Sequence, residues 1–183
     1  MIIVSQNCQV QELAMAKNEI RGAGSPSFLL AQIGSHAAAK FAEKLKPLGF
    51  APYHAGILRM IALSPGISQQ DLANALNMHA SRLVSVLDEL QARDLLERRP
   101  TETDRRLYAL HLTPSGGQSL VQIGHAAREH NYELMSGLSA EQQRQLTELL
   151  EILVQRQGLS KGVHPGYRRL HGGESTESKK MEP

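Results

Sequence analysis

The sequence predicts a mainly α-helical chain that carries a single β-hairpin, and three observations lead to this fold class. Apolar residues recur at helical spacing over most of residues 25–157. The period changes to an alternation only around residues 96–112, on either side of a turn-rich segment. Aromatic residues make up 4% of the 183 residues and Trp is absent. The core must therefore consist of aliphatic side chains, which suits packed helices better than a sheet sandwich.

The composition excludes several classes of protein. With 41% hydrophobic and 21% charged residues and a net charge of +2, the chain suits one globular domain, with or without an appended subdomain, and not a disordered charged tail. The one cysteine, Cys8, cannot form an internal disulfide. Because the start turns polar after four apolar residues and no apolar run could span a bilayer, we expect no signal peptide, no membrane partner and a cytoplasmic location.

The first half of the chain predicts an arm and two helices. Residues 1–24 have only a weak helical pattern and predict a short arm. A long helix should begin at Ser25-Pro26 and end at Gly49; its apolar stripe consists of Leu30, Ile33, Ala37, Phe41 and Leu45. A second helix should follow Pro52 and end before residues 65–66; its inward positions are His54, Ile57, Leu58 and Ile61.

A helix-turn-helix comes next. Ser68 and Asp71 form a capping-box pattern before a short helix, and Asn77-Met78 break it. The following helix, from about residue 80 to 93, has an inward stripe of Leu83, Val86, Leu87 and Leu90, and an outward face with Ser81, Arg82, Ser85 and Glu89. Two short helices with such a break are typical of a helix-turn-helix.

A hairpin and two helices complete the fold. Strands are expected at residues 96–99 and 107–112 around a turn at residues 100–104, with Tyr108, Leu110 and Leu112 on one side. Thr113-Pro114 should start a helix that ends at Gly137. Ser139 should cap a last helix; its inward positions are Leu146, Leu149, Leu150 and Leu153.

This order of elements is a winged helix-turn-helix, which predicts binding to double-stranded DNA. In the major groove, Ser81, Arg82 and Ser85 would offer hydroxyl and guanidinium groups to bases and phosphates. Arg105 and Arg106, at the tip of the hairpin, suit the strong negative potential of a narrow minor groove. The remaining DNA-binding candidates are His79 and Arg98.

The segment from Leu72 to Gly116 resembles the winged-helix core of the MarR family of bacterial transcriptional regulators. The resemblance is most specific at residues 104–106 (Asp-Arg-Arg), followed by a strand and residues 112–116 (Leu-Thr-Pro-Ser-Gly), and it extends more loosely over residues 28–157. It implies a mainly α fold whose two-stranded β-hairpin wing and helix-turn-helix are flanked by N- and C-terminal dimerisation helices. It also implies a homodimer, Arg106 with Arg105 in the minor groove, and Asp104 bracing these arginines.

The chain departs from the family pattern at two places. Asp94 stands where the family usually has Gly, at a helix end with positive φ, which Asp tolerates better than most residues. Along the second helix of the helix-turn-helix, where hydroxyl residues commonly alternate, this chain has His79, Ala80, Arg82 and Val84. We therefore expect an operator that differs from those typical of the family.

The resemblance also implies an effector, a small phenolic or aromatic acid. His36, Tyr53 and His54 are the candidates for its pocket, although each histidine could instead be a core residue with a satisfied partner. Metal and cofactor sites are not expected, since His125 and His130 lie about 140° apart around a helix. No phosphate-binding loop or hydrolase motif supports an enzyme.

The leading hypothesis is a homodimeric transcriptional repressor that binds a pseudo-palindromic operator and is released by the small ligand. Two alternatives stay open: a winged-helix module that binds a protein, and a redox regulator that senses oxidant through Cys8. The expected organisation is an arm (1–24), a dimerisation helix (25–50), a DNA-binding domain (51–113), C-terminal dimerisation helices (114–157) and a largely disordered tail (158–183).

Overall fold

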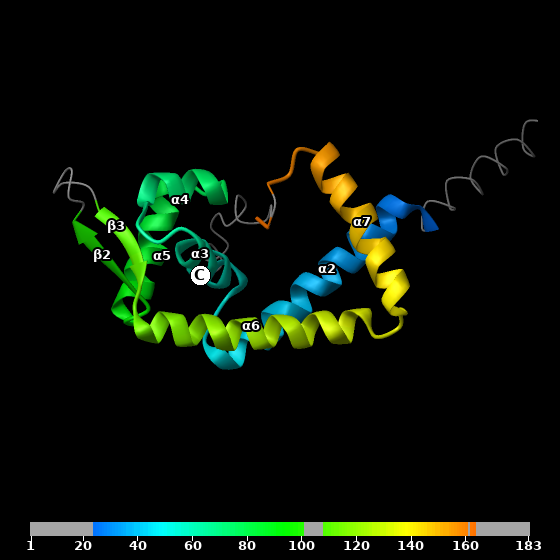
Figure 1. Ribbon diagram of the computed structural model, residues 1–183, viewed down its shortest axis with the longest axis horizontal. Helices are drawn as coiled ribbons and strands as arrows, with labels where there is room; N and C mark the ends of the chain where they lie inside the picture. Colours follow the sequence, from blue (N-terminus) through cyan, green and yellow to red (C-terminus); the bar gives the residue numbers. More distant parts are fainter. Residues whose placement is uncertain (1–23, 101–107, 161, 164–183) are drawn as a thin grey trace, which may run out of the picture. The chain divides into compact units, whose positions relative to one another are not determined.

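The computed structural model describes residues 24–100, 108–160 and 162–163 (Figure 1). The chain divides into two compact units, one up to Glu43 and one from Lys44 onward. Helix α2 (Pro26–Leu45) provides the described part of the first unit, apart from residues 24 and 25, and its last residues belong to the second. The predicted long helix is thus confirmed, and within its apolar stripe Leu45 is buried whereas Leu30 and Ile33 are exposed.

A short 3-10 helix, η2 (Lys46–Leu48), leads from α2 into the second unit, and Gly49 follows with a φ of 74°. A left-handed residue is needed for this sharp change of direction, and glycine adopts that conformation without steric cost. Nearby, Nζ of Lys44 donates to Glu133 over 2.9 Å and lies 3.5 Å from Glu129. The hydrogen bond to Glu133 raises the pKa of Lys44 and connects the beginning of the second unit to a later helix, α6 (Pro114–Met135).

The helix-turn-helix has the predicted order. Helix α3 (Pro52–Leu63) precedes it, and its two helices are α4 (Gln69–Leu76) and α5 (Ala80–Ala92). The hydroxyl of Ser68 caps α4 by accepting a hydrogen bond from the amide of Asp71 over 3.0 Å, as the capping pattern predicts. Asn77 then adopts a φ of 51° and ends α4, so the break between the two helices lies where the sequence places it.

The wing is confirmed as an antiparallel hairpin of β2 (Leu96–Pro100) and β3 (Tyr108–Leu112). A third strand, β1 (Ile67–Ser68), pairs with the other side of β3, so the sheet order is β1-β3-β2. The sequence pattern missed β1 because two residues are too few to show any period. Of the three side chains expected on one side of β3, only Leu110 is buried, whereas Leu112 is half-buried and Tyr108 is 49% exposed.

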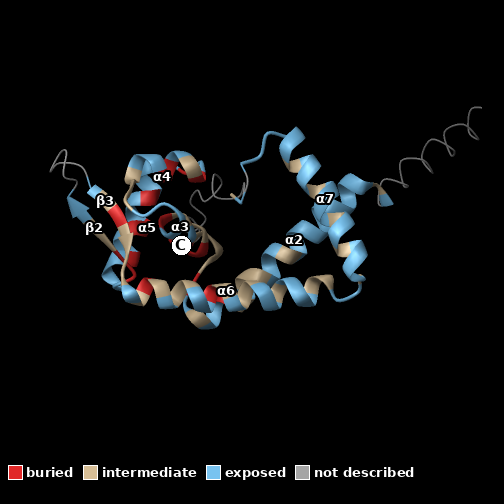
Figure 2. Cartoon of the chain, in the orientation of Figure 1, coloured by how far each residue is buried: buried red, intermediate tan, exposed pale blue. Residues whose placement is uncertain are grey.

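The hydrophobic core lies where α3, α4, α5 and the sheet meet (Figure 2). Burying these aliphatic side chains is the main source of stability for the winged helix-turn-helix. The largest fully buried side chains are those of Leu45, Ile57, Leu58, Ile61, Leu72, Leu76, Leu83, Val86, Leu87, Leu90, Leu96 and Leu110.

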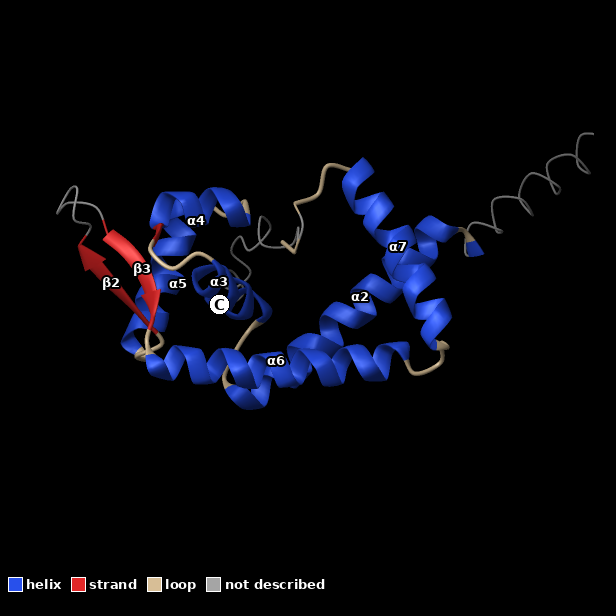
Figure 3. Ribbon diagram, in the orientation of Figure 1, coloured by secondary structure: helices blue, strands red, loops and turns tan. Residues whose placement is uncertain are grey.

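Two helices follow the wing, α6 (Pro114–Met135) and α7 (Ala140–Arg156) (Figure 3). Their predicted starts are confirmed, because Thr113 caps α6 and Ser139 forms a capping box with Gln142 at α7. Burial in α6 is confined to Gly116 and Ile123. The expected inward leucines of α7 are not buried; Leu149 and Leu153 are exposed and Leu146 and Leu150 are intermediate, since no other part of the described chain covers that face.

Candidate nucleic-acid interface

Helix α5 presents one buried and one exposed face. Its four predicted inward residues are at most 2% exposed, and they fix the rotation of the helix on the core. Ser81, Arg82 and Ser85 lie on the opposite side and are exposed, as predicted. Because α5 is the second helix of the helix-turn-helix, these side chains stand on the helix that such folds insert into the major groove.

Two polar side chains near the N-terminus of α5 have defined surroundings. His79 is the N-cap residue and is exposed, with no side-chain hydrogen bond to the helix end. The hydroxyl of Ser85 donates to the carbonyl oxygen of Ser81 over 3.3 Å. In this rotamer the proton of Ser85 is engaged, while its lone pairs can still accept a hydrogen bond from a base or a bridging water.

Arg82 has a partner within the protein. Its guanidinium carbon lies 5.7 Å from the centre of the Tyr53 ring, within the range of a cation–π contact. Tyr53 itself meets the ring of His54 edge-on, with the ring centres 4.2 Å apart. Sequence reasoning placed Tyr53 in a ligand pocket and missed this contact, because it joins side chains from two separate helices.

His54 is a core residue, only 4% exposed. Its Nδ1 accepts a hydrogen bond from the amide of Ala51 over 3.0 Å, which closes the first turn of α3. Its Nε2 is buried 3.3 Å from Oε1 of Glu89 on α5, without a hydrogen bond to any described residue. Burial lowers the pKa of His54, and this effect outweighs the opposing charge of Glu89.

Arg98, a predicted DNA contact, is bound from two sides. Its guanidinium donates to Asp88 over 2.7 Å and to the side-chain carbonyl of Gln91 over 2.6 Å, both on α5. These contacts leave the side chain of Arg98 only 19% exposed and join β2 to α5. The geometry therefore favours a role in positioning the wing, and a direct contact of Arg98 with DNA stays a prediction.

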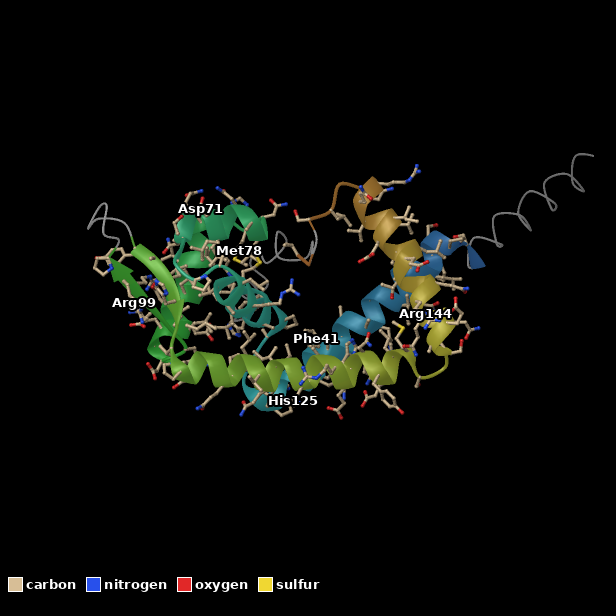
Figure 4. All side chains as sticks on the ribbon, viewed as in Figure 1. Phe41, Asp71, Met78, Arg99, His125 and Arg144 are labelled. Carbon is tan, nitrogen blue, oxygen red and sulfur yellow. The ribbon has the colours of Figure 1, made fainter. Side chains whose placement is uncertain are left out.

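The neighbouring Arg99 on β2 remains more exposed, and its guanidinium pairs with Glu97 of the same strand (Figure 4). The hydrogen bond from Arg99 lowers the pKa of Glu97. Asp104, Arg105 and Arg106 lie outside the described residues, and so does Cys8. Their proposed roles in the wing and in redox sensing therefore stay predictions.

Two hollows lie within the second unit. One, of about 280 Å³, is at the turn between α4 and α5; its lining residues are Ala73, Asn74, Asn77, Met78 and His79. The other, of about 670 Å³, is lined by α6, α7 and the residues after α7. His36, Tyr53 and His54 line neither hollow, and His36 is an exposed residue of α2 in the first unit.

Two findings on the described ranges concern metal-binding groups and membrane-spanning helices. Within residues 24–100, 108–160 and 162–163, no group of three or more His, Cys, Asp or Glu side chains could hold a metal ion. No helix in that part of the chain is long and apolar enough to cross a membrane.

The residue that replaces the family's usual glycine has the predicted conformation. Asp94 has a φ of 55°, in the left-handed region, immediately after α5. Its backbone carbonyl accepts a hydrogen bond from the hydroxyl of Thr113 over 2.6 Å, and its carboxylate accepts one from Ser115 over 3.2 Å. These contacts anchor the turn after α5 to the first residues of α6 and explain how Asp is accommodated there.

Comparison with known proteins agrees with this architecture. Residues 48–107 match the model of the MarR family. A candidate transcriptional regulatory protein for the hcr operon of Thauera aromatica is 37% identical over 105 residues, which make up 57% of this chain. The matched region spans 63% of the length of that relative.

Solved structures share the fold. A cysteine-to-serine variant of MarR from E. coli, in complex with operator DNA, has 25% identity and a TM-score of 0.62, and the match covers 75% of this chain and 96% of that one. A MarR family protein of Mycobacterium tuberculosis in complex with salicylic acid has 26% identity and a TM-score of 0.59, over 70% of this chain and 96% of that one. Residues 48–107 of this chain are therefore similar to the MarR family, and the relative from Thauera aromatica is described as a transcriptional regulatory protein.

Proposed function

We propose that the protein regulates transcription by placing α5 in the major groove of an operator. The observation that carries this proposal is the exposed face of α5, where Ser81, Arg82 and Ser85 stand opposite four buried aliphatic residues. A guanidinium and two hydroxyls can address both base edges and phosphates. The similar MarR from E. coli was solved in complex with operator DNA, and this supports binding of DNA by the present chain.

The wing completes the proposed DNA contact. Arg105 and Arg106 would enter the adjacent minor groove, and Asp104 would hold their side chains in place. The base of the wing is attached to α5 through Arg98. A wing that is fixed to the recognition helix would keep the two contacts at a constant separation on the duplex.

We propose that the regulator acts as a homodimer. Residues 25–50 and 114–157 would form its dimerisation helices, and residues 51–113 its DNA-binding domain. Apolar side chains exposed on α2 and α7 support this, because a second copy could cover them; they are Phe28, Leu29, Leu30 and Ile33 on α2 and Leu149, Ile152 and Leu153 on α7. A two-fold axis predicts a pseudo-palindromic operator with half-sites about 10 base pairs apart.

The finer proposal is a repressor that a small aromatic acid releases. The salicylic acid complex of the similar M. tuberculosis protein supports this class of effector. The ligand would bind the conformation in which the two recognition helices no longer match successive major grooves, and so would shift the population away from DNA. A difference in affinity of about 1–3 kcal/mol between the two states suffices for a measurable response.

The experiment that tests DNA recognition is selection of duplexes from a random-sequence library by the full-length protein, followed by titrations over a salt series. We expect enrichment of a pseudo-palindrome and affinity that falls steeply with salt. Arg106→Ala should weaken binding to all duplexes about equally and reduce the salt slope by about one, whereas Arg82→Ala and Ser85→Ala should change the ranking of sequences.

Arg144→Ala is the matched control for loss of one positive charge. Arg144 is exposed on α7 and pairs with Glu141 of the same helix. If the wild-type protein enriches no duplex sequence, the proposal of a sequence-specific regulator is wrong and the protein-binding module becomes the better interpretation. If Arg106→Ala leaves affinity unchanged, the wing has no part in binding.

A further inference from the structure

Three aromatic side chains, at or just before the start of α3, face three charged side chains, on or just after α5. This aromatic cluster consists of Phe50, Tyr53 and His54. Arg82 lies over Tyr53, Glu89 lies 3.3 Å from His54, and the guanidinium carbon of Arg93 lies 4.5 Å from the centre of the Phe50 ring. Each charged residue thus has one aromatic partner, and together they form a row along one side of α5.

Tyr53 occupies a fixed place in this cluster. Its ring meets the edge of the His54 ring, and His54 is buried and held through Nδ1 by the amide of Ala51. The ring of Phe50 approaches His54 from another direction, with the ring centres 6.2 Å apart. The Tyr53 ring is therefore a platform backed by the core, although it is itself only half-buried.

Arg82 lies over the Tyr53 ring and at the start of the proposed DNA-binding face. It belongs to the first turn of α5 and its side chain is exposed. A free arginine loses much rotamer freedom when it binds a base or phosphate, whereas one already held against a ring loses less. A cation–π contact uses none of the hydrogen bonds of the guanidinium, so the N–H groups that point away from the ring stay available for DNA.

We propose that Tyr53 is a positioning residue that sets operator specificity through Arg82. The ring holds the guanidinium in one direction before DNA arrives, so the contact favours the base steps that Arg82 can then reach. This inference rests on the proposed function, because it requires α5 to enter the major groove. It assigns Tyr53 to the recognition of DNA and not to the effector pocket in which the sequence placed it.

The test is a double-mutant cycle on the full-length protein. The probes are the duplex that the wild type enriches from a random library and a panel of its single-base variants. Tyr53→Leu should reduce the preference for the enriched duplex over its best-discriminated variant by about three- to tenfold. Tyr53→Phe keeps the ring and should restore that preference.

The effect of Tyr53→Leu in a protein that already carries Arg82→Ala shows whether Tyr53 positions Arg82 or has only a structural role. If Tyr53 acts through Arg82, adding Tyr53→Leu to Arg82→Ala should change the base preference no further. If Tyr53 has only a structural role, Tyr53→Leu should lower the DNA affinity by the same factor, and the melting temperature by the same number of degrees, in the wild type and in Arg82→Ala. The ranking of the single-base variants would then be unchanged. That additive result would overturn the inference.

A second measurement needs no variant at Tyr53. Nuclear Overhauser contacts between the δ-protons of Arg82 and the ring protons of Tyr53 should be present in the free wild-type protein, and their absence would overturn the proposal. If the wild type shows no preference for any duplex, the proposed function has failed. If it shows a preference and the cycle is additive, only the role of Tyr53 has failed.

Discussion

The guanidinium of Arg98 on β2 donates a hydrogen bond to Oδ1 of Asp88 on α5 over 2.7 Å, and this contact joins the wing to the recognition helix. Gln91, one turn further along α5, accepts a second hydrogen bond from the same guanidinium. An arginine can hold two acceptors at once because its donors form a rigid planar fork. The base of the wing thus cannot move away from α5 without breaking both hydrogen bonds.

Replacing Arg98 should therefore lower the thermodynamic stability of the folded protein by a measurable amount. We expect Arg98→Ala to lower the free energy of unfolding by about 1 kcal/mol, a value kept small because Asp88 is 60% exposed to solvent. Arg99→Ala, on the same strand, is the control and should cost less than about 0.5 kcal/mol, since its partner Glu97 lies on the same strand. Urea unfolding of both variants checks this, and equal losses would show that the link between β2 and α5 contributes nothing.

Two adjacent glycines at the start of α6 should respond in opposite ways to alanine. A Cβ atom on Gly116 would lie 1.8 Å from the carbonyl oxygen of Leu95, whereas one on Gly117 would meet nothing within 4 Å. Gly116→Ala should destabilise the protein by about 2 kcal/mol or more, because backbone must move to make room. Gly117→Ala should stabilise it by about 0.5–1 kcal/mol through helix propensity.

Thermal unfolding of the two alanine variants gives this comparison directly. The expected signature is a lower melting temperature for Gly116→Ala and a slightly higher one for Gly117→Ala. Melting temperatures that fall by the same amount would mean that the close approach of α6 to Leu95 does not exist in solution.

The pH dependence of stability should contain a contribution from His54. Burial lowers the pKa of His54 below 6.5, helped by Arg93 and Arg82 and opposed by Glu89. At a pH between the folded pKa and about 6.5, the unfolded chain binds a proton that the folded protein does not. The stability from this group is therefore complete above pH 6.5 and is lost as the pH falls below it.

His54→Gln removes the titrating group, so it should flatten the stability profile below about pH 6.5 even if it lowers stability overall. His36→Gln, at an exposed site on α2, is the control and should leave the slope as it is in the wild type. Chemical unfolding of the three proteins at several pH values measures the slopes. An unchanged slope in His54→Gln would contradict a buried neutral imidazole.

The proposed dimer depends on the apolar face of α7. Leu149→Asp or Ile152→Asp should convert the dimer to monomer, because a carboxylate would have to leave water when the face is covered. Leu63→Asp is the control, since Leu63 is 69% exposed at the end of α3 and outside the proposed dimerisation helices. Light scattering of the purified proteins distinguishes dimer from monomer. A wild-type protein that is already monomeric would refute the proposed dimer.

Sequence reasoning was most accurate where structure depends on neighbours in the chain. The caps at Ser68, Thr113 and Ser139 are confirmed, since each hydroxyl bonds a backbone amide three residues later. The positive φ of Asp94 and the buried face of α5 are also confirmed, and both predictions used only residues that are close in the chain. Reasoning failed for the leucines of α7, where the pattern correctly indicated an apolar face but could not indicate that nothing within the described chain covers it.

The sequence alone therefore determined the order of the helices and the hairpin, the ends of the helices, and which side of α5 carries Ser81, Arg82 and Ser85. Turn geometry and the helical period act over a few residues, so they can be read along the chain. Tertiary structure decided that Arg98 binds Asp88 and that Arg82 lies over Tyr53. Those partners come from different elements, and only the packing of the core brings long charged side chains within reach of one another.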